Sequence, residues 1–271
     1  MIVEKRSSLL CSLLTLFVIL QGQVAVPSQA SAAIRSDRLM SPNTRGFASI
    51  ADINTLGKHW RQTQMGQLMQ DESMRPFVKD LKRQLERKIS GVRDKLGIEF
   101  ADLKGVASGE IGVGIVERKG ARAAVALTVD VAGNHAQLAA LLQKVDQDLS
   151  QRQAKRATVD VKGTELTVYT IPVKVDGKLA TSWAVYFVQD NILCATDNLD
   201  EAKLMLGRFA NDQPALATVE SYQVTSQRCE KESNSLAPEV IGTLTPSATP
   251  TQSSRLARPI KKSVGATMLK F

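Results

Sequence analysis

The chain has 271 residues, of which 43% are hydrophobic, 23% are charged and 4% are aromatic, with 2 His and 3 Cys. This composition is ordinary for a globular protein of one or two domains. It excludes a disulfide-dense small protein, a His-rich metal site and an aromatic platform for stacking nucleotide bases.

The formal net charge of +8 is unevenly distributed along the chain. Residues 33–239 contribute +2, whereas residues 240–271 contribute +5 from five Lys and Arg and no acidic residue. A nearly neutral body with a basic tail is a poor electrostatic footprint for specific nucleic-acid binding. We therefore expect no nucleic-acid partner and regard the tail as a candidate for contact with an anionic surface.

Residues 1–32 have the pattern of a secretory signal peptide. A positive n-region, Lys5-Arg6, precedes an apolar run from Leu9 to Leu20, and Ala30-Ser31-Ala32 matches the small-residue cleavage pattern. The run has 12 residues, fewer than the ~20 that span a bilayer, so an uncleaved anchor is the weaker alternative. We expect cleavage after Ala32 and a secreted or periplasmic protein, with membrane contact only through this segment before cleavage.

Two cysteines, Cys194 and Cys229, follow the predicted cleavage site. Cys194 lies in a strand pattern and is expected to be buried, because a free cysteine packs as a small hydrophobe. Nothing in the sequence places Cys229 near it. We expect two unpaired thiols, and an oxidising compartment leaves a disulfide between them open.

Residues 33–57 are rich in Ser, Asn, Pro and Gly and are predicted to be a linker or a loosely ordered arm. The folded domain is expected over 58–239, and it begins with helical periodicity from His59 to Leu96. Apolar residues recur there at steps of three and four. The face that they form carries Phe77, Leu81, Leu85, Ile89, Val92 and Leu96.

Two residues delimit this helix, since Pro76 suits its first turn and Gly97 suits its end. A shorter helix before it would carry Met65, Leu68 and Met69. Methionines in such a cluster can form an adaptable binding surface. We expect them to pack in the core instead.

After Gly109 the hydrophobic period changes to two, which predicts β-hairpins. The first hairpin joins 109–116 to 122–131, and a helix follows with Asn134 and Gln137 as its capping box. The second half repeats this order and ends in a helix capped by Asn198 and Glu201. Its predicted strands cover 157–162, 165–171, 183–188 and 192–196.

Tight turns between these strands exclude parallel crossovers, because parallel neighbours need a dozen or more linking residues. We predict an α+β fold, in which a mostly antiparallel sheet of hairpins has helices packed on one face. A duplication of the two halves is left open, since few residues are identical between them.

Three glycines, Gly109, Gly112 and Gly114, raise the question of a nucleotide-binding loop. Their order is G-x-x-G-x-G within a strand pattern, whereas the dinucleotide fingerprint is G-x-G-x-x-G between a strand and a helix. We therefore expect Gly112 and Gly114 to line a strand face on which a helix packs closely.

Catalytic groups are sparse in this sequence. The histidines, His59 and His135, lie at predicted helix starts, and no hydrolase motif accompanies them. Glu110, Asp130 and Asp160 fall on predicted strands and are the candidates for a carboxylate mechanism. Solvated strand faces explain these three acids better.

Metal ligands are equally sparse. Asp197, Asn198 and Asp200 crowd one turn without the spacing of a calcium loop, and the His and Cys residues have no zinc spacing. We predict no catalytic, cofactor-binding or metal-ligating residues.

Residues from about 60 to 240 resemble a family of planctomycete-type secreted bacterial proteins of unknown function. The resemblance implies export, an α+β body and no assigned reaction, and it brings no catalytic residues with it. The stretches that carry it are Met65-Gly66-Gln67-Leu68, Arg75-Pro76-Phe77, the run from Asp102 to Glu110, the run from Gly163 to Tyr169, and Ala195-Thr196-Asp197.

The chain departs from that family after Leu236-Ala237-Pro238-Glu239-Val240. Members of the family continue there into a Trp-x-Val-Asp-Pro-Phe-Gly-Tyr-like stretch, which a shifted reading frame of the residues after Val240 can encode. We hypothesise a frameshift just after Val240 and a C-terminally truncated member of the family. Residues 240–271 are correspondingly predicted to be a disordered basic tail, and a native Ser/Thr/Pro-rich tail is the competing account.

Three hypotheses about function follow. The first is a non-enzymatic exported protein that acts as an envelope or periplasmic interaction module. The second is a carboxylate-based hydrolase with scattered site residues, and the third is an anionic-surface binder that works through the basic tail. Substrate, partner and oligomeric state are left open.

Overall fold

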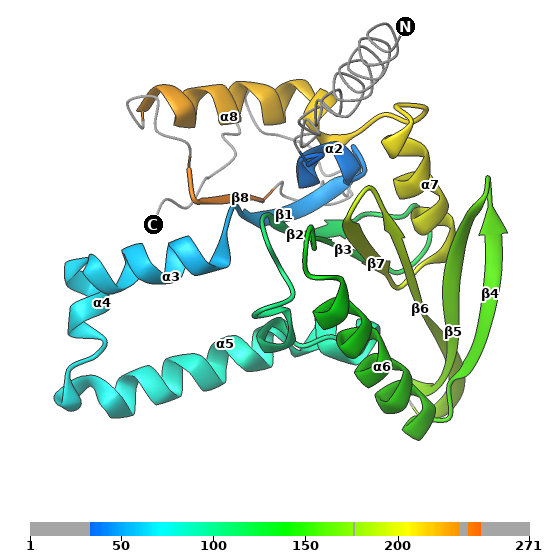
Figure 1. The fold of residues 1–271 in the computed structure, drawn as a ribbon, viewed down its shortest axis with the longest axis horizontal. Coiled ribbons are helices and arrows are strands. Elements are labelled where there is room, and N and C mark those ends of the chain that lie inside the picture. Colours follow the sequence, from blue (N-terminus) through cyan, green and yellow to red (C-terminus); the bar gives the residue numbers. More distant parts are fainter. Residues whose placement is uncertain (1–32, 176, 233–237, 245–271) are drawn as a thin grey trace, which may run out of the picture. The chain divides into compact units, whose positions relative to one another are not determined.

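The computed structural model describes residues 33–175, 177–232 and 238–244, and its side chains exclude Lys82, residues 85–92 and Val175. The predicted signal peptide and residues 245–271 of the predicted tail lie outside this range. The described chain forms one eight-stranded sheet in the order β4-β5-β6-β7-β3-β2-β1-β8, with helices beside it (Figure 1).

Every neighbouring pair of strands in the sheet is antiparallel. The turn between β4 and β5 places Lys162 and Gly163 at φ of 55° and 84°, and the turn between β6 and β7 places Asp190 and Asn191 at 50° and 62°. Positive φ at both central residues matches the twist of two-residue hairpins. The strands are β1 (Thr44–Ile50), β2 (Ile111–Val116), β3 (Ala124–Asp130), β4 (Lys155–Val161), β5 (Thr164–Val175), β6 (Lys178–Gln189), β7 (Ile192–Thr196) and β8 (Val240–Leu244).

Helices α5, α6 and α7 fall where the sequence periodicity predicts them, whereas α2 and α8 were not predicted. α5 has Pro76 in its first turn and Gly97 at φ of 64° after its last residue, as expected. The helices are α2 (Ser36–Leu39), α3 (Ile53–Gln62), α4 (Gln64–Leu68), α5 (Arg75–Leu96), α6 (His135–Gln151), α7 (Leu199–Phe209) and α8 (Glu220–Glu232), with 3₁₀ turns at Glu72–Met74, Phe100–Leu103 and Leu216–Thr218.

The α+β class and the antiparallel sheet are therefore as predicted, but helices pack against both faces of the sheet. One core lies between the sheet and α6 and includes Leu127 and Val145. The other lies between the opposite face and α2, α7 and α8, and includes Ala126 and Met205. The reason lies in β3, where six consecutive residues are buried. Successive side chains of a strand point to opposite faces of the sheet, so both faces of β3 have to be packed against other elements.

The repeated order of hairpin, cap and helix is not repeated in space. α6 packs in one core and α7 in the other. Two antiparallel neighbours such as β3 and β7 are related by a two-fold rotation whose axis is perpendicular to the sheet. Such a rotation would place α6 and α7 on the same face of the sheet. The two halves thus differ in three dimensions, whatever their origin.

The two predicted capping boxes have different outcomes. At α7, Asn198 Oδ1 accepts a hydrogen bond from the Glu201 amide at 2.9 Å, which confirms the cap half of the box, while the Glu201 side chain pairs with Arg208. At α6, the side chain of Asn134 makes no cap bond, and its Nδ2 instead donates to the carbonyl of Val106 at 3.1 Å. The capping box expected at Asn134 is therefore wrong, because a neighbouring loop takes the same amide group.

Residues 33–57 differ from their prediction as a linker or loosely ordered arm. They contain α2 and β1, and β1 lies inside the sheet between β2 and β8. Leu39 and Met40 are fully buried. Polar composition misled the prediction because many of the buried residues in this segment are themselves polar, among them Ser36, Thr44 and Ser49.

Gly112 and Gly114 have the role that we expected of them. A methyl group on Gly112 would lie 2.3 Å from Ser36 Cβ, and one on Gly114 would lie 2.6 Å from Met40 Sδ. A side chain at Gly112 would therefore displace α2 from β2, whereas one at Gly114 would require the side chain of Met40 to move. The glycines permit a close helix-to-strand contact and have no part in a nucleotide loop.

The predicted tail begins as ordered structure. Residues 240–244 form β8, which pairs antiparallel with β1 from Gly46↔Leu244 to Ile50↔Val240. Disorder predicted from residue 240 onward is therefore wrong for these five residues. β8 follows directly after the point at which we placed the frameshift.

Candidate functional site

The three acids proposed for a carboxylate mechanism do not meet in a cavity of the described structure. Glu110 Oε2 accepts a hydrogen bond from the Ser36 amide at 2.9 Å, which fixes the start of α2. Asp130 Oδ1 accepts from the Ala132 amide at 3.0 Å and from Ser108 Oγ at 3.1 Å.

Asp160 lies apart from the other two, on β4 at the opposite edge of the sheet. It stands opposite Glu165 in the strand register and accepts a hydrogen bond from the Gly163 amide at 3.3 Å. Each of the three acids thus holds a local turn or helix start. Three cavities of the described structure are lined by other residues.

The histidines and cysteines are also separated. His59 on α3 pairs through Nδ1 with Glu239, whereas His135 is exposed at the start of α6. Cys194 and Cys229 are free thiols, and Cys194 is buried in β7, where desolvation raises the pKa of its thiol. Within the described residues, no group of three His, Cys, Asp or Glu side chains is placed to hold a metal ion.

A groove of about 590 Å³ lies between α6 and strands β4 to β7. Its polar side chains include Asp146, Arg156, Glu165 and Tyr169. The Tyr169 hydroxyl donates to Asp146 Oδ1 at 2.7 Å, so these two polar side chains of the groove already satisfy each other. The sequence carried no local signal for this groove, because its residues come from a helix and several strands.

Burial dominates the ionisation of the tyrosines. Desolvation, with the nearby Asp146, raises the pKa of Tyr169 to about 12. Desolvation also raises the pKa of Tyr186, whose hydroxyl donates to the carbonyl of Leu96, and that of Tyr222, whose hydroxyl donates to Asp37 Oδ2 at 3.1 Å. These are all three tyrosines of the chain.

A spectrophotometric titration should therefore show little tyrosinate at pH 10, the ordinary tyrosine pKa. A tyrosine whose pKa is higher in the folded than in the unfolded chain stabilises the fold at pH values below the unfolded pKa. This stabilisation is lost as the pH rises through the folded pKa. We expect tyrosinate absorbance to appear together with alkaline unfolding, and Tyr169→Phe to weaken the fall of stability above pH 10. A native chain that ionises one tyrosine reversibly at its ordinary pKa contradicts this assignment.

The largest departure from the sequence prediction is the segment 53–96, which comprises α3, α4 and α5 and is named the helical arm below. Figure 1 shows α3 leaving the sheet after β1 and α5 returning to it. Between Ile53 and Gln84, Gly66 is the one buried residue among those whose side chains are described. Four large apolar side chains are about half exposed: Met65 at 51%, Leu68 at 48%, Phe77 at 55% and Leu81 at 41%.

Core packing of the methionine cluster, which we expected, is therefore wrong for Met65 and Leu68. Among the stripe residues of α5 whose side chains are described, Leu96 is fully buried, whereas Phe77 and Leu81 are exposed. The periodicity of the sequence predicted one apolar face of the helix. It could not show that the N-terminal part of that face lacks a described partner.

The arm is attached to the body at both ends. At the end of α5, Lys95 Nζ forms an ion pair with Asp197 at 2.5 Å, and the Leu96 carbonyl accepts from Tyr186. At the start of α3, Asp52 Oδ1 accepts from the Asn54 amide at 2.7 Å and caps the helix. These contacts fix where the arm begins and ends, while its residues 53–81 are exposed or partly exposed apart from Gly66.

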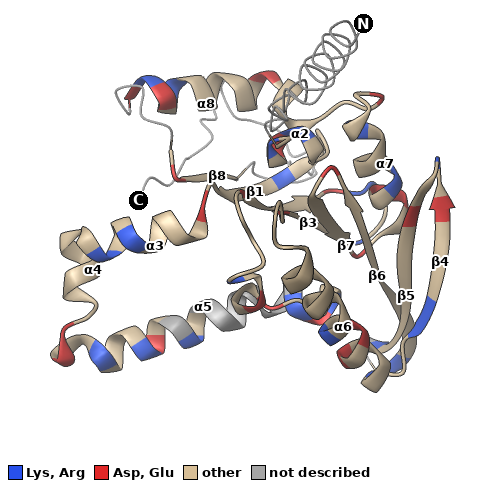
Figure 2. Ribbon diagram, viewed as in Figure 1, with Lys and Arg blue, Asp and Glu red and all other residues tan. Residues whose placement is uncertain are grey.

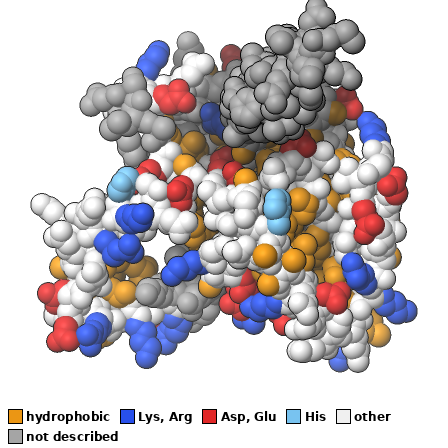
Figure 3. All heavy atoms as spheres, viewed as in Figure 1, with side chains coloured by type: hydrophobic (Ala, Val, Ile, Leu, Met, Phe, Trp, Pro, Cys, Tyr) orange, Lys and Arg blue, Asp and Glu red, His pale blue; other side chains and the backbone are white. Residues whose placement is uncertain are grey.

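The arm also concentrates positive charge. It contains 10 Lys and Arg against 5 Asp and Glu, a net charge of +5, whereas residues 33–52 and 97–239 contain 18 against 21, a net charge of −3. Figure 2 shows Lys and Arg along α5. Figure 3 shows hydrophobic side chains of the arm open to one face of the molecule and bordered by basic ones. The near-neutral body inferred from the sequence is thus two regions of opposite charge.

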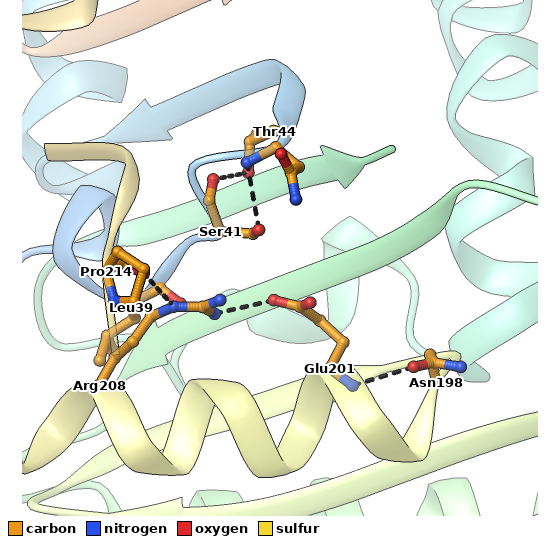
Figure 4. Close-up of polar contacts among 8 residues, drawn as sticks. Leu39, Ser41, Thr44, Asn198, Glu201, Arg208 and Pro214 are labelled. Atoms are coloured by element: carbon orange, nitrogen blue, oxygen red, sulfur yellow. Dashed lines mark hydrogen bonds and ion pairs between the residues drawn. The ribbon is translucent and has the colours of Figure 1, made fainter. Parts of the chain in front are cut away.

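A buried charged pair, missed in the sequence, is structural. Arg208 and Glu201 on α7 are 4% and 5% exposed, and Arg208 Nη1 lies 2.8 Å from Glu201 Oε1 (Figure 4). The guanidinium also donates to the carbonyls of Leu39 and Pro214, each at 3.0 Å. The pair joins α7 to α2 and to the loop after α7, so it stabilises the fold and lines no cavity described above.

Comparison of the chain with protein-family models, curated proteins and solved structures found no match. None of the helices in the described part of the chain combines the length and apolar character needed to cross a membrane.

Proposed function

We propose that this chain is an exported, non-enzymatic interaction module of the cell envelope or periplasm, and that it binds its partner through the helical arm. We also propose its membership of the planctomycete-type secreted family, on the resemblance of the stretches given above. Export is supported by the n-region, apolar run and cleavage pattern of residues 1–32.

The observation that carries the binding role is the exposed apolar face of the arm. Single exposed apolar side chains are normal on a protein surface, whereas a group of them marks an interaction site. Met65, Leu68, Phe77 and Leu81 lie on consecutive elements of one excursion from the sheet. Their exposure has a cost in water that burial against a partner would remove.

Site-specific cross-linking tests this function. A photoreactive residue is placed at Phe77 or, as the control, at Leu179, an 82% exposed apolar position on β6 outside the arm. The chain is expressed with its leader in a diderm bacterium, and envelope fractions are irradiated. We expect adducts from position 77 only, on a protein whose N-terminus is Ala33. Equal labelling from both positions contradicts the role of the arm, and an intact leader on cytosolic protein contradicts export.

A further inference from the structure

We propose that the helical arm docks on the surface of an anionic lipid bilayer. This inference rests on the proposed function and names the partner of its binding element. It goes beyond the membrane contact expected from the leader, because the arm belongs to the folded domain. The basic tail, residues 240–271, was our first candidate for contact with an anionic surface. The structure describes only residues 240–244 of this tail.

The first step is the shape of the apolar face. Phe77 and Leu81 are four residues apart on α5 and therefore lie on one side of the helix. Both are exposed, as are Met65 and Leu68 on α4. An amphipathic helix with such a face and a basic opposite face lies in the plane of a membrane interface, with its apolar side chains among the acyl chains.

The second step is charge. α5 alone contains 8 Lys and Arg against 3 Asp and Glu, a net charge of +5. Cations near an anionic leaflet are attracted to its negative surface potential, and long basic side chains can extend to the headgroups from an apolar contact. Residues 33–52 and 97–239, which include the rest of the described body, have a net charge of −3. The same surface repels this part of the chain and favours approach through the arm.

The third step separates a bilayer from other partners. A nucleic acid supplies negative charge but no apolar phase for Phe77 and Leu81. A second copy of this chain would bring two α5 helices together, each with a net charge of +5. An anionic bilayer supplies negative charge and an apolar phase together, which is the combination that the arm presents.

The test is co-sedimentation of the full chain with vesicles of phosphatidylglycerol and phosphatidylcholine, compared with phosphatidylcholine alone. We expect binding to the anionic vesicles that weakens with salt. Phe77→Ser with Leu81→Ser should reduce the partition coefficient at least tenfold, and Lys58→Glu with Lys79→Glu should do the same. Every variant carries the same N-terminal segment, so differences between variants report on the arm.

Two matched controls keep the result specific. Leu179→Ser removes an exposed apolar side chain outside the arm, and Lys155→Glu with Lys178→Glu makes the same charge change on β4 and β6. Both should bind anionic vesicles like the unaltered chain. Unchanged circular dichroism and thermal unfolding in all four variants show that the fold is retained.

Equal binding to neutral and anionic vesicles overturns the inference, and so does an equal loss of vesicle binding in the control variants. A dimer that forms without lipid and is abolished by Phe77→Ser with Leu81→Ser also overturns it. So does binding to a soluble polyanion that this double variant leaves intact. A protein adduct from position 77, with no binding to vesicles, refutes the lipid partner and supports the proposed function. No adduct and no vesicle binding refute both.

Discussion

Arg208→Met is expected to lower the free energy of unfolding by about 3–5 kcal/mol, because it leaves the buried carboxylate of Glu201 without its partner. The substitution also removes donors from the carbonyls of Leu39 and Pro214. Urea denaturation followed by circular dichroism measures the loss. An effect of this size is a large part of the stability of a typical domain, roughly 5–15 kcal/mol.

The control for this prediction is Arg228→Met on α8. Arg228 pairs with Glu232 one turn away at 3.0 Å, and both side chains are exposed. Exposed pairs of this spacing contribute only about 0.3–0.5 kcal/mol. The double variant Glu201→Leu with Arg208→Met should recover part of the loss, because no buried charge then remains unpaired. Equal effects of Arg208→Met and Arg228→Met would refute the structural role of the buried pair.

Deletion of residues 33–42 is expected to prevent folding. The deletion removes α2, including the fully buried side chains of Leu39 and Met40. Loss of a buried Leu or Met side chain typically costs about 2–5 kcal/mol, and the deletion removes two such side chains. It also removes the Met40 carbonyl, which accepts from the Leu216 amide at 2.8 Å.

The measurement is soluble yield and thermal unfolding of the shortened chain beside two point variants. Leu39→Ala should lower the melting temperature clearly, whereas Leu179→Ala, at an 82% exposed position, should not. A shortened chain that melts like the full one would restore the view of residues 33–57 as a linker. The same outcome would remove α2 from the account of Gly112 and Gly114.

Local signals predicted much of the fold. The hairpins were recognisable because turn residues such as Lys162-Gly163 and Asp190-Asn191 adopt positive φ within two residues of each other. α5 was recognisable because Pro76, its apolar spacing and Gly97 act over neighbouring turns of one helix. Asn198 was recognisable for the same reason, since its cap bond reaches a residue three positions away.

The candidate site was not recognisable in this way. Phe77 and Leu81 are of interest because they are exposed. A helix face with the same apolar spacing is usually buried, so the sequence pattern could not indicate this exposure. Likewise, the charge of Arg208 gave no sign of burial, because one of its carbonyl partners, Leu39, is far away in the chain. Asp146 and Tyr169 meet only because α6 lies across β5.

The amino-acid sequence by itself determined α5, α6, α7, the antiparallel hairpins between residues 109 and 196 and the α+β class, because periodicity, caps and two-residue turns act between near neighbours. Only the tertiary structure decided that β1 and β8 join the sheet, that helices cover both of its faces and that the arm is exposed and basic against an acidic body. The physical reason is that burial and net charge of a region depend on which distant segments pack together.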